Sequence, residues 1–160
     1  GGHGPDSGQH AIRFAPGTGE LGMFQGAKSY LLGNSEGQTL DTYSISAGLD
    51  YASVGPEHAW LKEIGRVNYS WATDEEAMNA FKDLCETEGI IPAIESSHAV
   101  AGAYKAARDL KEKGYEHPVM IVNISGRGDK DMNTAGKWFG YLTDEQAAAL
   151  EANGATGNNA

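Results

Sequence analysis

Two short apolar runs, separated by a long stretch with helical spacing, constrain the fold of this chain more than any other feature. Residues 90–94 and 118–124 each have the length and apolar character of a buried strand. Between them, residues 97–113 place Val100 and Leu110 on one helical face. Strand, helix and strand in this order indicate a parallel pair with a right-handed crossover. We therefore predict an α/β fold, a three-layer parallel sheet flanked by helices.

Capping signals place the other helices. Residues 73–76 (Thr-Asp-Glu-Glu) and 143–146 (Thr-Asp-Glu-Gln) both have the pattern of a capping box before an apolar stretch of helical spacing. Shorter helices are predicted over residues 56–64, where proline occupies the first turn, and over 132–139. Ser97 is the predicted N-cap of the helix that follows the first apolar run.

The two ends of the chain carry weak structural signals. Residues 1–26 contain eight glycines and predict an irregular loop. Residues 28–32 form a short apolar element, and residues 39–47 alternate as in a strand or an extended loop. The Asn- and Gly-rich residues 153–160 predict a disordered tail. Because the chain opens at Gly1 in a loop, we expect an excerpt whose sheet is incomplete through truncation at the N-terminus.

Charge and hydropathy exclude several classes of protein. The net charge is −10, with 22 acids against 12 bases, so we predict no nucleic-acid partner. No apolar run approaches the ~20 residues that span a bilayer, so we predict no membrane association and a cytoplasmic location. The single cysteine, Cys85, cannot form an internal disulfide, and its helical context predicts a packing role.

Polar groups follow both predicted strands. Glu95 comes directly after the first apolar run, and Ser125 with Gly126 comes after the second. In open α/β sheets, ligands bind beyond the carboxyl ends of the strands, so neighbouring strands would bring Glu95 and Ser125 to one crevice. Two ordinary roles remain open. Glu95 would serve equally as a solvated acid at a helix N-terminus, and Ser125 as a serine in a turn.

Three longer motifs carry a family resemblance. Residues 44–58 read Ser-Ile-Ser-Ala-Gly-Leu-Asp-Tyr-Ala-Ser-Val-Gly-Pro-Glu-His. Residues 89–99 read Gly-Ile-Ile-Pro-Ala-Ile-Glu-Ser-Ser-His-Ala, and residues 125–131 read Ser-Gly-Arg-Gly-Asp-Lys-Asp. In this order, the three blocks resemble signature segments of the tryptophan synthase β subunit family, and the resemblance extends from Gly1 to about Phe139.

The resemblance implies an activity and its partners. The family uses pyridoxal phosphate to condense L-serine with indole into L-tryptophan by β-replacement, a carbon–oxygen lyase reaction that ends tryptophan biosynthesis. An α subunit supplies the indole through a tunnel, and the β subunit forms a β–β homodimer. Residues 1–152 would be the C-terminal part of this pyridoxal-phosphate-dependent fold.

The resemblance also implies roles for single residues. Ser125 would hydrogen-bond the pyridine nitrogen of the cofactor, Glu95 would lie near the ring, and Gly126 would let the backbone approach it. Asp50 would form a salt bridge when the enzyme closes. Phe24 would line the indole tunnel.

A cation site and several departures complete the comparison with the family pattern. Tyr51 and Ser53 would give backbone carbonyls to a monovalent cation, Na⁺ or K⁺. Ala52 stands where the family pattern has proline, and Ala11 where it has glycine near the cation. The family's catalytic lysine, its catalytic glutamate and its phosphate-binding loop would all precede Gly1, so we expect the chain alone to be inactive.

Two other functions stay open. The protein would also fit a relative of this family that acts on other serine- or threonine-derived substrates. From a different class, the chain would fit a stand-alone small-molecule-binding or interaction module that uses the same fold without catalysis.

Overall fold

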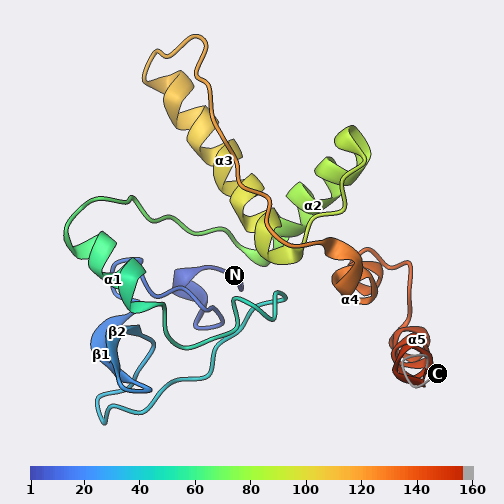
Figure 1. Cartoon of the computed structure of the whole chain (residues 1–160), viewed down its shortest axis with the longest axis horizontal. Helices are drawn as coiled ribbons and strands as arrows, with labels where there is room; N and C mark the ends of the chain where they lie inside the picture. Colours follow the sequence, from blue (N-terminus) through green and yellow to red (C-terminus); the bar gives the residue numbers. More distant parts are fainter. Residues whose placement is uncertain (157–160) are drawn as a thin grey trace.

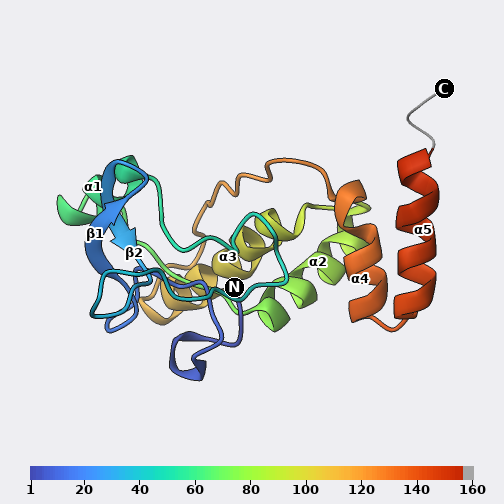
Figure 2. The ribbon, with the colours of Figure 1, turned by 90° about the horizontal axis from the view of Figure 1, so that it is seen from below.

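The computed structural model describes residues 1–156 of the 160-residue chain, and it describes side chains up to residue 152. Two long helices, α2 and α3, occupy the middle of an elongated molecule (Figures 1 and 2). The hairpin and helix α1 lie at one end, and helices α4 and α5 lie at the other (Figure 2). The elements in chain order are η1 (Pro5–Ser7), β1 (Glu20–Phe24), β2 (Ala27–Leu31), α1 (Pro56–Glu63), α2 (Asp74–Glu88), α3 (Ile94–Glu112), η2 (Gly128–Asp131), α4 (Met132–Trp138) and α5 (Asp144–Thr156).

The sheet of the described residues is an antiparallel hairpin of β1 and β2, which pair from Glu20 opposite Leu31 to Phe24 opposite Ala27. Its two-residue turn holds Gln25 at φ 49° and Gly26 at φ 80°. Positive φ at both positions suits the turn that matches strand twist. The apolar element predicted over 28–32 is confirmed as β2, whereas the irregular loop predicted over 1–26 is wrong for β1.

Helix α2 begins and ends as its sequence predicts. The Thr73 hydroxyl accepts a hydrogen bond from the Glu76 N–H at 3.2 Å, and the Glu76 carboxylate accepts one from the Thr73 N–H at 2.8 Å. Gly89 ends the helix in the left-handed region, with φ 66°. One apolar cluster joins α2 to α3 and α4 through Met78, Phe81, Ile94 and Ala135, with Cys85 packed against it as predicted.

Helix α3 begins at Ile94, three residues before its predicted start at Ser97. The reason is a cap from a distant segment, because the Asp131 carboxylate accepts a hydrogen bond from the Ile94 N–H at 2.9 Å. The Ser97 hydroxyl lies inside the helix and donates to the Ala93 carbonyl at 3.1 Å. Ser97 is therefore not the N-cap, and the prediction of its capping role was wrong.

The two predicted strands form no sheet in the described residues, and Ile94, at the end of the first run, is already the first residue of α3. Val119 and Ile121 are 94% and 97% exposed, and the segment that contains them runs back past α3 (Figure 1). The 90–94 run makes one backbone hydrogen bond with a distant segment of the chain, from the Gly128 N–H to the Ile91 carbonyl at 3.1 Å. A strand needs a neighbour to satisfy its N–H and C=O groups, and none lies beside either run here. The chain is thus a mixed α/β structure whose sheet is small and antiparallel.

The C-terminal helices follow the sequence closely. The second capping box is present, with Thr143 and Gln146 exchanging hydrogen bonds of 2.9 and 3.2 Å. Helix α5 continues to Thr156, into the predicted tail 153–160, and residues 157–160 lie outside the described part. Within that part, no helix has the length and apolar character needed to cross a bilayer.

We predict fast amide exchange over residues 119–123 in the 160-residue chain. The structure shows no backbone hydrogen bonds for this stretch, so its amides are expected to exchange nearly as fast as those of a disordered peptide. The amides of α2 and α3 serve as the protected reference within the same sample. Hydrogen–deuterium exchange measures both, and protection of 119–123 as strong as that of α3 would contradict the unpaired state.

Candidate functional site

The three sequence blocks meet at the carboxylate of Glu95, in the first turn of α3. The Gly48 N–H, from the first block, donates to Glu95 Oε1 at 3.0 Å. The Lys130 ammonium, from the third block, donates to Glu95 Oε2 at 3.0 Å and to Asp131 at 2.7 Å. Both oxygens of one carboxylate are therefore engaged by segments far apart in sequence, which fixes the position of Glu95.

Two glycines allow this close approach. A Cβ atom on Gly48 would lie 2.7 Å from Glu95 Oε1, and one on Gly128 would lie 2.2 Å from the Pro92 carbonyl oxygen. Both distances are shorter than van der Waals contact, so any larger residue would push the segments apart. Steric contact therefore explains why glycine occupies these positions in the first and third blocks.

The electrostatics keep Glu95 ionised. Burial alone would raise the pKa of Glu95, but hydrogen bonds from Lys130, from the helix's own first turn and from Gly48 outweigh it and lower the pKa to about 2. Burial would lower the pKa of Lys130, but Asp131 and Glu95 raise it above its ordinary value. The pair therefore carries opposite full charges at neutral pH.

Ser125 and Gly126 lie next to the same helix turn. The Ser96 hydroxyl donates to the Ser125 carbonyl at 2.5 Å, and the two hydroxyl oxygens are 3.4 Å apart. Ser125 is exposed, so its hydroxyl can reach a ligand. Gly126 has φ 70°, a conformation that favours glycine. Ser125 therefore lies beside the helix turn that carries Glu95, but the neighbouring strands that were expected to bring the two residues to one crevice do not form within the described residues.

A buried carboxylate that the sequence analysis did not single out positions the first block. Asp74 is 1% exposed and accepts hydrogen bonds from the N–H groups of Gly2 and Ile45 at 2.7 and 2.8 Å. Burial raises its pKa, but nearby His98 and these two N–H groups lower it overall. His98 Nε2 lies 3.7 Å from Asp74 Oδ1, beyond hydrogen-bond distance. Nothing in the Thr-Asp-Glu-Glu pattern distinguishes this acid from an exposed helix-start residue.

The other predicted site residues lie within the first block, except Phe24, which is the last residue of β1. Asp50 is exposed, and its N–H donates to the Ser46 carbonyl at 3.1 Å. The Phe24 ring meets the Tyr51 ring edge-on, with centroids 5.5 Å apart. Ser53 is buried opposite Leu31 of β2. Phe24 and Tyr51 are therefore neighbours, and within the described residues none of these four side chains forms a hydrogen bond or ion pair with Glu95 or Ser125.

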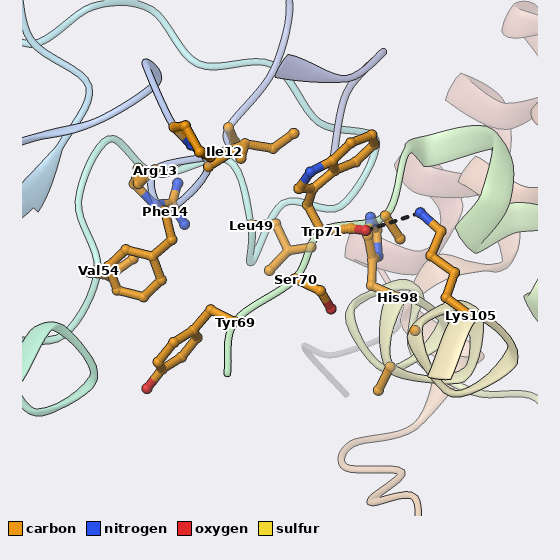
Figure 3. Close-up of a pocket in the computed structure, with 17 residues that line it drawn as sticks. Ile12, Arg13, Phe14, Leu49, Val54, Tyr69, Ser70, Trp71, His98 and Lys105 are labelled. Atoms are coloured by element: carbon orange, nitrogen blue, oxygen red, sulfur yellow. Dashed lines mark hydrogen bonds between the residues drawn. The ribbon is translucent and has the colours of Figure 1, made fainter. Parts of the chain in front are cut away.

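A hollow of about 790 Å³ lies beside the meeting point of the blocks, between the N-terminal loop and α3 (Figure 3). Arg13, Phe14 and Val54 are on one side, and His98 and Lys105 are on the other (Figure 3). Leu49 also lines it, but Glu95, Ser125 and Asp50 do not. The hollow is thus adjacent to the predicted cofactor residues without including them.

Comparison with known proteins identifies the family. No family model matches the chain. A tryptophan synthase beta chain of Mycobacterium tuberculosis (strain H37Rv) is 57% identical over 144 residues, which cover 90% of this chain and 33% of that protein. Relatives of the same name from Streptomyces coelicolor and Bordetella petrii are 52% and 50% identical, over 92% and 87% of this chain and 34% and 33% of theirs. This chain belongs to the tryptophan synthase beta chain family.

The chain spans about a third of the length of these curated relatives, and it matches their C-terminal part. The family resemblance inferred from the three blocks is confirmed. In this beta-chain segment, Glu95 is the residue at which all three blocks converge. The roles of single residues toward a ligand remain predictions, because the comparisons concern the chain as a whole.

We predict that Glu95 titrates near pH 2 and that Gly48→Ala moves its pKa back toward the ordinary value of 4.5. The pKa is lowered by folding, so Glu95 stabilises the fold above pH 4.5 and loses this contribution as the pH falls toward 2. The contribution is on the order of 2 kcal/mol, and partial exposure of the side chain reduces it. Carboxyl NMR titration measures the pKa directly.

The matched control is Gly102→Ala, on the same helix, where an added Cβ meets no atom within 4 Å. This variant should leave the Glu95 titration unchanged. If Glu95 titrated at its ordinary value in the wild-type protein, the contacts to Gly48 and Lys130 would not form in solution.

Proposed function

We propose that this chain is the C-terminal part of a tryptophan synthase β chain that condenses L-serine with indole into L-tryptophan. The reaction is a pyridoxal-phosphate-dependent β-replacement by a carbon–oxygen lyase, the last step of tryptophan biosynthesis. The observation that carries the proposal is the junction at Glu95, where the three family blocks bring a carboxylate, a lysine and a glycine N–H together. Identity of 50–57% to relatives of that name supports it.

The residues near Glu95 fit the ring of pyridoxal phosphate. Ser125 offers an exposed neutral hydroxyl, which can hydrogen-bond a pyridine nitrogen in either protonation state. A Cβ built on Gly126 meets only Ala93 within 4 Å, at 3.6 Å, so the backbone surface there is open to a flat ligand. A neutral hydroxyl, a glycine and a fixed carboxylate are chemically suited to one face and one edge of the ring.

Pyridoxal phosphate supplies an electron sink for breaking the Cβ–O bond of serine. Ser125 would orient the ring through its nitrogen. A neutral hydroxyl does not favour protonation of that nitrogen, whereas a carboxylate would. Glu95, held ionised by Lys130 and Gly48, would keep a fixed negative charge near the ring. Asp50 would close the site by pairing with an arginine, which excludes water during the reaction.

The exposed apolar segments support a larger fold in the whole protein. We infer that residues 90–94 and 118–124 pair with further strands in a three-layer parallel sheet, and that residues 1–152 act as one part of it. The support is the exposure of Val119 and Ile121, since side chains of this kind are covered on both faces of parallel sheets.

The partners follow from the same family membership. The proposal includes an α subunit that supplies indole, a β–β homodimer, and an indole path lined by Phe24. Phe24 is partly exposed beside Tyr51, as a residue on the wall of a path would be. The cytoplasmic location stays a prediction. A stand-alone binding module is less favoured, because the matched relatives carry an enzyme's name over 87–92% of this chain.

Of the two carbonyls that would hold the monovalent cation implied by the resemblance, Na⁺ or K⁺, the one of Tyr51 is already engaged. The Tyr51 carbonyl already accepts a hydrogen bond from the Arg13 guanidinium. Leu32 donates to the Ala52 carbonyl at 2.9 Å, and Val54 donates to the Tyr30 carbonyl at 3.2 Å, which ties this stretch to β2. The proposed function therefore includes pyridoxal phosphate and no step that depends on a cation.

We predict that two Ser125 variants of the full-length protein slow tryptophan formation to different degrees. Ser125→Asp places a carboxylate near the pyridine nitrogen, favours its protonation and should change the absorbance of the bound cofactor and slow tryptophan formation strongly. Ser125→Ala removes one hydrogen bond and should slow it by roughly 2- to 10-fold. Absorbance spectra and turnover with L-serine and indole measure both.

Two controls sharpen this test. The 160-residue chain alone should form no tryptophan, because the family's Schiff-base lysine lies outside it. Wild-type spectra and turnover in both Ser125 variants would show that this hydroxyl does not touch the cofactor. A full-length protein that binds the cofactor but makes no tryptophan from serine and indole would overturn the proposed reaction.

We also predict that Asp50→Ala in the full-length protein slows turnover about 10-fold or more while cofactor affinity stays nearly unchanged. Asp50 is exposed and makes no side-chain hydrogen bond or ion pair within residues 1–152, so its removal should not disturb the local fold. Asp41→Ala, at another exposed acid in the preceding loop, is the matched control. Loss of cofactor affinity with normal closure would instead make Asp50 a structural residue.

A further inference from the structure

The contact between Arg13 and the Tyr51 carbonyl places a side-chain cation at the predicted cation position. Arg13 belongs to the N-terminal loop, and its Nη1 donates to the carbonyl oxygen of Tyr51, 38 positions along the chain. It lies on the wall of the hollow beside Phe14 and Val54 (Figure 3). A guanidinium and a monovalent cation bind a carbonyl oxygen for the same reason, since both present positive charge to its lone pairs.

Both partners of this contact are held in place. A Cβ on Gly19 would lie 2.2 Å from the Arg13 carbonyl oxygen, so the loop closes tightly on the Arg13 backbone. The Tyr51 hydroxyl donates to Gln25 Oε1 at 2.8 Å, and its ring packs on Phe24. The Tyr51 side chain is thus held against the hairpin by contacts that do not involve Arg13.

The guanidinium also has unused donor capacity. Arg13 Nε is buried and has no hydrogen-bond partner within the described residues. Burial lowers the pKa of Arg13 from its ordinary value, but a guanidinium stays protonated in proteins. An arginine with a free N–H group can donate to further oxygen atoms. Oxygen atoms are also the ligands that a monovalent cation binds.

Charge repulsion makes the two occupants exclusive. A cation on the Tyr51 oxygen would lie about 4 Å from the guanidinium. At an effective dielectric constant of about 20, that repulsion weakens cation binding by about a thousandfold. Arg13 and a cation therefore compete for one carbonyl. Arg13 has the advantage, because it is part of the chain and its local concentration does not depend on the solution.

We propose that the Arg13 guanidinium takes the place of the monovalent cation at the Tyr51 carbonyl, so that this protein neither binds nor needs Na⁺ or K⁺ at that position. The inference rests on the proposed function only in that the family implies the cation. Arg13 then links the N-terminal loop to the segment that carries Asp50 and Tyr51. That link is permanent, where a bound ion would exchange with the solvent.

The test uses full-length protein exchanged into N-methylglucamine chloride at constant ionic strength. Melting temperature and ¹³³Cs NMR linewidth are measured while KCl or CsCl replaces the organic salt. The wild-type protein should show no cation-specific change in either. Arg13→Ala should gain saturable Cs⁺ binding and a K⁺-specific rise in melting temperature of about 5 °C at about 100 times its Kd.

Arg66→Ala removes an equal charge from an exposed position after α1 and should behave as the wild-type protein does. Saturable cation binding by the wild-type protein overturns the proposal. A lack of binding in both the wild-type protein and Arg13→Ala overturns it too, because Arg13 would then not be what excludes the ion. These readouts do not involve tryptophan formation, so a failure of the proposed reaction would be seen separately in the turnover assay.

Discussion

The hydrogen bonds of the Glu95 carboxylate hold the three sequence blocks of this chain against one another. This carboxylate sits at the first turn of α3, where the helix dipole favours a negative charge, and each of its oxygens engages a different segment. A neutral side chain would satisfy neither the Lys130 ammonium nor the Gly48 N–H as well. Asp131 extends the same principle, since it binds Lys130 and caps the helix at Ile94. Two acids and one lysine thus define where α3 begins and what lies against it.

Local signals in the sequence predicted the helices well. Both capping boxes form, because their hydrogen bonds involve residues three positions apart and need no distant partner. The start of α3 was mispredicted for the opposite reason. Its cap comes from Asp131, 37 positions away, and no local pattern around Ser97 can reveal such a contact. The β1–β2 hairpin was also missed, although Gln25-Gly26 between two short runs is a signal for a tight turn.

Sequence reasoning named candidate site residues but not the contacts that hold them. The blocks contain Glu95 and Ser125, and the structure places Ser125 against Ser96, the neighbour of Glu95 in the first turn of α3. The expected cause was a pair of parallel strands, whereas the observed cause is a charge network and a serine–serine contact. Asp74 was not foreseen, since burial turns an ordinary helix-start acid into the anchor of the first block. The hydrogen bond from Arg13 to the Tyr51 carbonyl was not foreseen either, because it joins residues 38 positions apart in the sequence.

The unpaired stretch over 118–124 has a consequence for handling and synthesis of the protein. Its backbone groups are free, and Val119 and Ile121 are almost fully exposed, so it is a template for strand pairing with any chain that reaches it. Copies of the segment in solution would meet one another as readily as they meet an intended neighbour. Pairing with a wrong partner would then hide the same backbone groups that a correct sheet requires. Self-association through residues 118–124 therefore competes directly with the correct pairing of this segment in a sheet.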